Sequence, residues 1–230
     1  DRPASPYARN LPWSSAADWL RAGWHDIRKA PWSSLAYGLF LTLVSYAVLW
    51  ALNASQLLYL ALPAISGFLI VGPFLAIGLY EKSRRQAQGQ QVSFSDMLVF
   101  RPASGGQLAY AGLLFGLLIL FWLRAADLLY ALFFGLVPFP GAEEALTNVL
   151  TTPRGWALIA TGTLVGGLFA AFAFAISAFS IPMLVSRKSD ALTAMGLSFV
   201  MTVQNLRPIL AWGTIVVFGL GLSALTGLVG

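Results

Sequence analysis

Residues 156–185 read WALIATGTLVGGLFAAFAFAISAFSIPMLV, thirty consecutive residues without Asp, Glu, Lys or Arg. A helix needs about 20 mostly apolar residues to cross a bilayer, so this stretch predicts a membrane span. Four other stretches have a similar character, and only one of them contains charged residues. We therefore expect an all-α, polytopic transmembrane helical bundle with five visible spans, at about 33–52, 57–80, 107–137, 156–185 and 208–230. Residues 1–32 would form a cytoplasmic arm, and residues 33–230 the bundle.

The composition supports this class of protein and excludes several others. Hydrophobic residues make up 58% of the chain and charged residues 10%, whereas an ordinary soluble domain has about 25% charged residues. There is no cysteine and only one histidine, His25, so disulfides, thiolate metal sites and a self-contained haem or copper centre are not expected. No nucleotide-binding loop or catalytic triad is present. We expect no cofactor, no metal, no nucleic-acid partner and no enzymatic activity.

The basic residues indicate the orientation, because short cytoplasmic loops of membrane proteins are enriched in Lys and Arg. Twelve of the 14 basic residues fall on one side of the predicted spans, and one, Arg154, falls on the other. The twelve are Arg2, Arg9, Arg21, Arg28, Lys29, Lys82, Arg84, Arg85, Arg101, Arg187, Lys188 and Arg207. The N-terminus is therefore predicted to be cytoplasmic, in a bacterial inner membrane.

The third span is longer than one perpendicular crossing. Its 31 residues would form a helix of about 46 Å at 1.5 Å per residue, against a hydrocarbon core of about 30 Å. Either the helix tilts and projects from the membrane, or residues 128–137 lie along the outer interface.

The N-terminal arm carries an amphipathic pattern. Ser15 and Asp18 suggest a capping box, the apolar residues Leu20, Trp24 and Ile27 recur at helical spacing, and Pro31 would end the helix. Such a helix suits the surface of the inner leaflet. Lipid or partner contact at the inner interface is predicted for Trp13, Trp19, Trp24, Trp32, Lys82, Arg84 and Arg85.

A short pattern opens each odd-numbered span: LAYG at 35–38, LAYA at 108–111 and LAWG at 210–213. Each copy follows a segment that reads as a surface helix, the second at 93–100 and the third at 189–206. We interpret this as three repeated units of a surface helix followed by a helical hairpin. The third unit lacks its return helix, so a sixth span is expected past residue 230.

Several short segments carry a resemblance to a known family. They are WLRAGW at 19–24, Pro31, SLAYG at 34–38, GLYE at 78–81, SRR at 83–85, IPML at 181–184, TAM at 193–195 and Trp212. The chain resembles an uncharacterised bacterial family of predicted integral membrane proteins, whose members are sometimes labelled as cytochrome c oxidase subunits. The resemblance implies a membrane bundle and supplies no catalytic or binding residues. With His25 as the one histidine, it leaves open only a haem-free accessory subunit of such a complex.

Arg124 and Asp127 are the charged residues inside a predicted span, the third. Their i,i+3 spacing places them on one helix face, where they can pair, and charges within a span are functional candidates. Their position near the outer end favours a structural or snorkelling pair. A partner contact and a transport path remain alternatives.

Small residues and prolines give two further features. Helix packing, within the bundle or against another subunit, is predicted for Gly112, Gly116, Gly162, Gly166, Gly167 and Ala171, because small residues let helices approach closely. Pro63 and Pro73 suggest a broken second span, as found in transporters, although simple kinks explain them equally well.

Two functions compete at this point. The first is a non-catalytic accessory or assembly subunit of a larger bacterial membrane complex, respiratory or photosynthetic in kind, with the lipid bilayer and a membrane protein as partners. The second is a small-solute or ion transporter. A transporter should line a polar cavity at mid-depth with some of Ser66, Thr42, Ser45, Thr161, Thr163 and Ser177.

Overall fold

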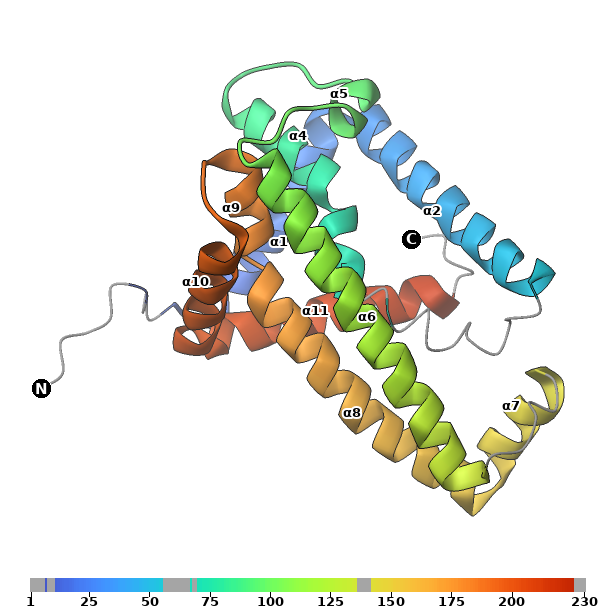
Figure 1. Ribbon diagram of the computed structural model, residues 1–230. Helices are drawn as coiled ribbons and strands as arrows, with labels where there is room; N and C mark the ends of the chain where they lie inside the picture. The colour runs from blue at the N-terminus through green and yellow to red at the C-terminus, as the bar shows by residue number, and fades with distance from the viewer. Residues whose placement is uncertain (1–6, 8–10, 56–66, 68–69, 136–141, 226–230) are drawn as a thin grey trace, which may run out of the picture. The chain divides into compact units, whose positions relative to one another are not determined.

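The computed structural model describes residues 7, 11–55, 67, 70–135 and 142–225, and all regular secondary structure within them is helical (Figure 1). The all-α prediction is confirmed to that extent. The helices are α1 (Ser15–Lys29), α2 (Pro31–Ala54), α4 (Ile77–Ala87), α5 (Phe94–Leu98), α6 (Gly105–Phe134), α7 (Ala142–Thr151), α8 (Pro153–Ser177), α9 (Ser180–Ser186), α10 (Ala191–Gln204) and α11 (Leu206–Leu225).

Four helical stretches of the described residues are long and apolar enough to cross a membrane. They are Pro31–Ala54, Gly105–Phe134, Pro153–Ser186 and Leu206–Ser223. They correspond to four of the five predicted spans, and half of the remaining one, at 57–80, lies outside the described residues. Large apolar side chains such as Leu39, Leu168 and Phe218 stay exposed along them, as hydrocarbon-facing surfaces require. The chain is a multi-pass membrane protein.

Local sequence signals set several helix ends. Pro31 and Pro153 are the first residues of α2 and α8, the position where proline's missing N–H costs nothing. The Thr152 hydroxyl accepts the Gly155 N–H at 3.0 Å and so caps α8. Gly135, at φ 83°, follows the end of α6. α6 runs unbroken through Leu128, which favours the long tilted or projecting helix over a separate interfacial segment.

The start of α1 differs from the prediction. α1 begins at Ser15 after Ser14, whose side chain makes no capping hydrogen bond, and Asp18 instead pairs with Arg21 at 3.0 Å. The expected capping box at Ser15 and Asp18 is therefore wrong. The helix ends at Lys29, directly before Pro31, as expected.

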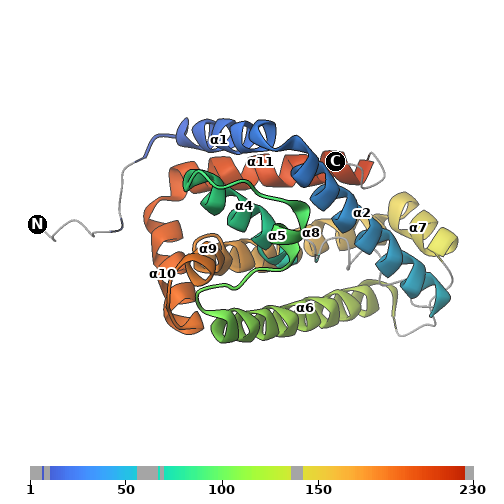
Figure 2. The ribbon, with the colours of Figure 1, turned by 90° about the horizontal axis from the view of Figure 1, so that it is seen from above.

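Contacts divide the chain into two compact units. Unit 1 comprises Asp1–Ser45, Pro73–Ala111 and Ala175–Gly230. In it α9 packs against both α4 and α10 (Figure 2), and α1 contacts α4 and α11. Its buried apolar side chains include Met97, Ile181 and Leu184. Three shorter helices, α1, α5 and α10, each precede a long apolar helix, which is the order that the repeat hypothesis requires. Their position at a membrane surface and the repeats themselves remain predictions.

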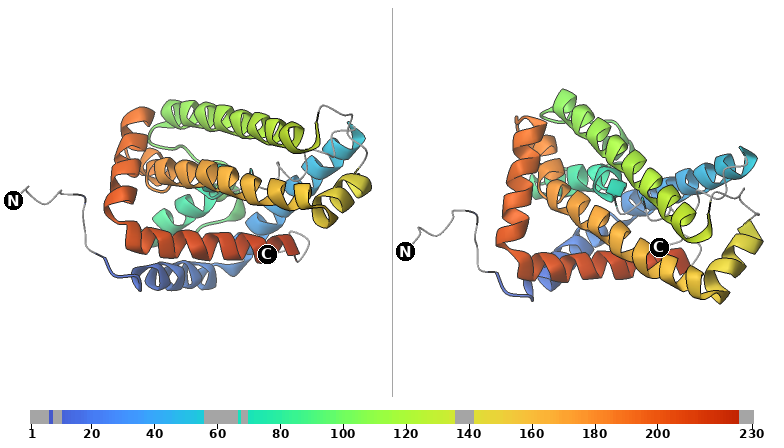
Figure 3. Two further views of the ribbon diagram at one scale, coloured as in Figure 1. Left: turned by 90° about the horizontal axis from the view of Figure 1, so that it is seen from below. Right: turned by 60° about the horizontal axis from the view of Figure 1, so that its bottom comes forward.

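Unit 2 comprises Tyr46–Gly72 and Gly112–Phe174, and its described core is the hairpin formed by α6 and α8 (Figure 3). The buried Trp122 ring of α6 lies over Gly166 of α8, where an added Cβ would come within 2.8 Å of the ring. Trp122 also contacts Phe169, at 5.7 Å between ring centroids. A glycine on α8 thus creates the space for the aromatic side chain.

Candidate functional site

Two neighbouring charged residues on α4 are almost completely buried. Glu81 is 1% exposed and Lys82 is 2% exposed, although Lys and Glu are almost never fully buried unless they are paired. Both lie in unit 1, in the helix that follows the second predicted span. Their partners define the most elaborate polar cluster among the described residues, and we take it as the candidate site.

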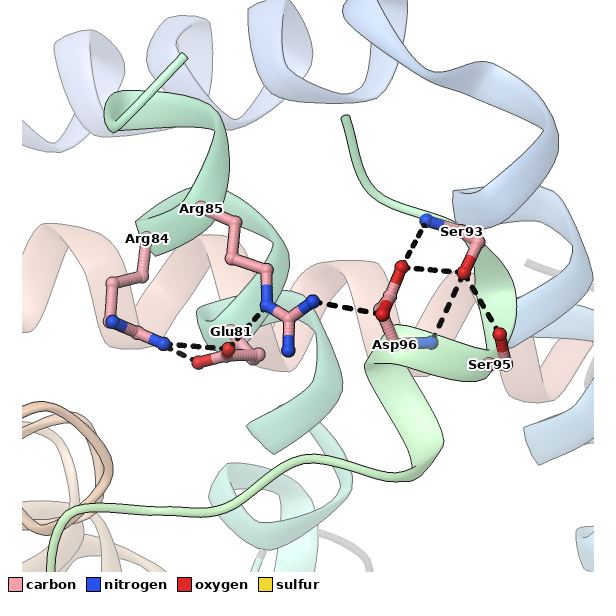
Figure 4. A network of polar contacts seen from close by, with 6 residues as sticks. All are labelled: Glu81, Arg84, Arg85, Ser93, Ser95 and Asp96. Carbon is pink, nitrogen blue, oxygen red and sulfur yellow. Dashed lines mark hydrogen bonds and ion pairs between the residues drawn. The ribbon is translucent and has the colours of Figure 1, made fainter. Parts of the chain in front are cut away.

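Glu81 is the centre of an ion network between α4 and α5 (Figure 4). Arg84 donates to its two carboxylate oxygens at 2.8 and 2.7 Å, and the Arg85 Nε donates to it at 2.6 Å. Arg85 continues the network by donating to Asp96 at 2.9 Å. We call Glu81, Arg84, Arg85, Ser93 and Asp96 the α4–α5 network.

Asp96 holds the far end of this network through a capping box. Its carboxylate accepts the Ser93 N–H at 2.9 Å, and the Ser93 hydroxyl accepts the Asp96 N–H at 3.3 Å. These bonds fix the start of α5 and orient the Asp96 carboxylate toward Arg85. Hydrogen bonds from Ser93 and Arg85 lower the pKa of Asp96, so it is ionised at neutral pH.

Lys82 points the other way, into the corner where α1 meets α2. Its ammonium donates to the Ala30 carbonyl at 2.9 Å and to the Ser34 hydroxyl. Ala30 caps the C-terminus of α1, where free carbonyls and the helix dipole favour a cation. Burial lowers the pKa of Lys82, and Asp26 of α1 partly offsets this effect. Lys82 therefore links α4 to the α1–α2 corner.

The network occupies both carboxylate oxygens of Glu81. Burial alone would raise the pKa of Glu81, but hydrogen bonds from Arg84 and Arg85, together with their positive charges, lower it below its ordinary value of 4.5. A carboxylate occupied in this way is a structural anion. It is poorly suited to act as a general base, because its oxygens already accept three guanidinium hydrogen bonds.

This arrangement predicts a pH dependence of stability. Because the pKa of Glu81 is depressed by folding, its stabilisation is complete above about pH 4.5 and is lost as the pH falls through the folded-state pKa. Melting temperatures in detergent, measured from pH 7 to pH 3, should show the wild type losing its advantage over Glu81→Gln below about pH 4.5. A constant difference across this range would contradict the assignment.

Two hydroxyl groups bridge interruptions in the long helices. The helical segment before α4 is interrupted at Ala76; there the Tyr37 hydroxyl donates to the Leu75 carbonyl at 2.9 Å and accepts the Gly78 N–H at 3.3 Å. Such interruptions leave backbone groups that need partners when no water is present.

The interruption between α8 and α9 is bridged in a similar way. Ser198 of α10 accepts the Phe179 N–H at 3.1 Å and donates to the Ala175 carbonyl at 2.7 Å. Pro182, which lacks an N–H, lies just beyond this interruption. Ser198 thus bonds to backbone groups on both sides of the interruption, and Thr202 of α10 also donates to the Ala175 carbonyl, at 3.3 Å.

Replacing Ser198 with alanine should therefore leave two buried backbone groups with fewer partners. We expect a loss of about 1.5 kcal/mol in the free energy of unfolding, measured as a lower melting temperature in detergent. Ser45→Ala is the matched control, because the Ser45 hydroxyl only donates back to Leu41 of its own helix. Equal effects of the two substitutions would contradict the bridging role.

The structure places the predicted intramembrane pair on the surface of α6. Arg124 donates to Asp127 at 3.3 Å, and their side chains are 82% and 40% exposed. The i,i+3 pairing is as predicted. Because the pair lies on the outer surface of the helix, it does not line an internal path in the described residues.

The predicted interface residues separate into exposed and buried groups. Trp13, Trp24 and Trp32 are exposed, whereas Trp19 is half-buried with its ring edge against Trp212. Arg84 and Arg85 are half-buried in the α4–α5 network. The structure places Lys82 differently from our expectation of a lipid or partner contact, because its ammonium is buried and donates inward.

The small residues also differ from one another. Gly166 packs against Trp122, but an added Cβ at Gly116, Gly162 or Gly167 would meet nothing within 4 Å. Ala171 is exposed and Gly112 is half-buried. Of the predicted packing glycines Gly116, Gly162, Gly166 and Gly167, only Gly166 makes a close contact across the α6–α8 hairpin.

The role of Asp96 in the α4–α5 network was not predicted from the sequence, nor were the roles of Tyr37 and Ser198 at the two helix interruptions. The Ser93-x-x-Asp96 spacing was a readable capping-box signal. The local sequence does not indicate the roles of Tyr37 and Ser198, because their hydrogen-bond partners are distant in the chain. Within the described residues no group of three or more His, Asp or Glu side chains could hold a metal ion.

Comparison with known proteins gives one family. Residues 60–186 match the model of a family described as "Predicted integral membrane protein (DUF2189)". The matched region contains the α4–α5 network, Gly78 and Pro182. No curated protein and no solved structure matches the chain.

Proposed function

Because the chain belongs to this DUF2189 family of predicted integral membrane proteins, we propose a function suited to a multi-pass membrane protein. The protein serves as a non-catalytic accessory or assembly subunit of a larger complex, respiratory or photosynthetic in kind, in a bacterial inner membrane. Its N-terminus lies on the cytoplasmic side, in keeping with the distribution of Lys and Arg. Its partners are the bilayer and another membrane protein.

The observation that carries this proposal is an exposed stripe of small residues on α8. Ala160, Thr163, Gly167 and Ala171 are all exposed and recur at intervals of three or four residues, so they share one helix face. Gly166, the glycine that packs against α6, belongs to a different face. Small residues favour close approach of a second membrane helix, and we assign this stripe, the α8 small-residue face, to a helix of the partner subunit.

Gentle detergent extraction of native membranes followed by native-gel separation tests the proposal. The wild type should migrate with a large complex whose other components are then identified, and Gly167→Leu should release it. Gly219→Leu in α11 is the matched control, since Gly219 likewise has open space around it. Migration of the wild type as a monomer or dimer would refute the proposal.

A transporter is the second candidate, favoured by the two interrupted helices at Ala76 and before α9. Three of the six residues expected to line its path offer it little support, whereas Ser177 is fully buried and Thr161 is half-buried. Thr42 and Ser45 donate back to carbonyls of their own helix, Thr163 is exposed, and Ser66 lies outside the described residues. Specific uptake of a solute into proteoliposomes would favour this candidate over the subunit.

A further inference from the structure

A hollow lies at the corner where α1 meets α2, on the side of the α4–α5 loop. It is an open depression with a volume of about 530 Å³, in the range of small-molecule sites. Its apolar walls come from Ala36, Val92 and Phe94, and its polar lining includes Lys29 and Ser33. Trp32 completes the rim. All its lining residues belong to unit 1, and none of them is part of the α8 small-residue face.

The electrostatics of the hollow favour an anion. Lys29 is exposed, and no carboxylate among the described residues pairs with it. The Ala30 carbonyl, at the lining residue next to Lys29, already receives the Lys82 ammonium at 2.9 Å and the Ser33 hydroxyl at 3.0 Å. Occupied in this way, that carbonyl does not compete for Lys29.

The surroundings of the hollow are those of a membrane interface. Trp32 is 81% exposed at the first turn of the α2 span, where tryptophan rings sit at the level of lipid headgroups. On α1 the exposed side chains of Leu20, Trp24 and Ile27 form an apolar stripe, and the Arg28 guanidinium lies 5.9 Å from the Trp24 ring centroid.

The orientation of this stripe is fixed by the rest of unit 1. Asp26 of α1 accepts from the Ser83 hydroxyl of α4 at 2.6 Å, and Trp19 lies edge-on to Trp212 of α11. Asp26 and Trp19 are two turns apart on one face of α1. The stripe is therefore turned away from the protein, and Lys29, which lines the hollow, lies on the opposite side of α1 from it.

We propose that this hollow binds one anionic glycerophospholipid from the leaflet that carries α1. Lys29 pairs with the phosphate, Trp32 lies at the glycerol level, and the walls formed by Ala36, Val92 and Phe94 contact the upper part of an acyl chain. This assignment does not depend on the proposed subunit function. Lipid contact was predicted from the sequence for Lys82, Arg84 and Arg85. Because Lys82 is buried and the two arginines pair with Glu81, we assign the lipid-binding role to Lys29 instead.

Native mass spectrometry can test the site on the full chain in mixed micelles containing equal amounts of phosphatidylglycerol and phosphatidylcholine. The wild type should retain phosphatidylglycerol in preference, and Lys29→Gln should lower the ratio of the two bound lipids about fivefold, as expected for one basic residue near a lipid surface. Lys29→Arg, which keeps the charge, should preserve the ratio.

Lys188→Gln removes the same charge from an exposed position outside the hollow and should leave the ratio within about twofold. An unchanged ratio in Lys29→Gln, or an equal fall in Lys188→Gln, would overturn the proposal. Displacement of bound phosphatidylglycerol by inorganic phosphate alone would also overturn it, because the ligand would then be free phosphate. Unaltered elution of each variant on size exclusion confirms that it has folded.

Discussion

Glu81→Ala is expected to lower the melting temperature of the detergent-solubilised protein by about 6 to 12 °C. The substitution removes the carboxylate that joins Arg84 and Arg85 and leaves two guanidinium groups with their main partner gone. Removing one member of a buried ion pair costs about 3 kcal/mol or more, and for a chain of this size each kcal/mol corresponds to about 2 to 4 °C. Size-exclusion chromatography after heating, over a temperature series, measures the shift.

The control for this prediction is Glu144→Ala on α7. Glu144 is an exposed carboxylate, so its removal should change the melting temperature by no more than about 2 °C. If Glu81→Ala behaved like this control, the α4–α5 network would be a surface feature with no role in holding α4 to α5.

The membrane spans could be predicted because their signal is local. An apolar run without charges specifies a spanning helix wherever it occurs, and the prolines at 31 and 153 mark helix starts directly. By contrast, the burial of the charged run at 81–85 cannot be predicted from neighbouring residues alone. Lys82 donates to the Ala30 carbonyl at the end of α1 and to Ser34 of α2, and Arg85 donates to Asp96 of α5; no spacing within the run indicates these contacts. Only the pairs of Glu81 with Arg84 and Arg85 follow helical spacing, i,i+3 and i,i+4. Sequence reasoning therefore recognised the charges but treated them as an exposed cluster.

Two identical spacings show how context decides a local motif. Ser15-x-x-Asp18 and Ser93-x-x-Asp96 both fit a capping box, yet only the second forms. Before α1, the backbone N–H of Ser15 donates to the Pro12 carbonyl at 3.1 Å, and that of Ala17 donates to the Ser14 carbonyl at 2.9 Å. A preceding turn already satisfies the first donors of α1, so a side-chain cap is not needed. The chain before α5 offers no such turn, and Ser93 caps the helix.

Gly78→Ala is expected to destabilise the protein by about 3 kcal/mol, although alanine normally stabilises a helix relative to glycine by about 0.5 to 1 kcal/mol. A Cβ at this position would lie 2.5 Å from the Tyr37 ring and 2.8 Å from the Met97 carbonyl oxygen. The ring cannot move away without breaking the hydrogen bonds of its hydroxyl to Leu75 and Gly78.

Gly38→Ala provides a control of opposite sign, because Gly38 lies within α2 and a Cβ there would meet nothing within 4 Å. Its melting temperature should rise by about 1 to 4 °C, whereas that of Gly78→Ala should fall. The two substitutions make the same chemical change in the same protein, so a difference in sign isolates the contact between Tyr37 and Gly78. A rise in both variants would mean that α4 can shift away from α2 and that the Tyr37 hydroxyl does not hold the interruption at Ala76 in place.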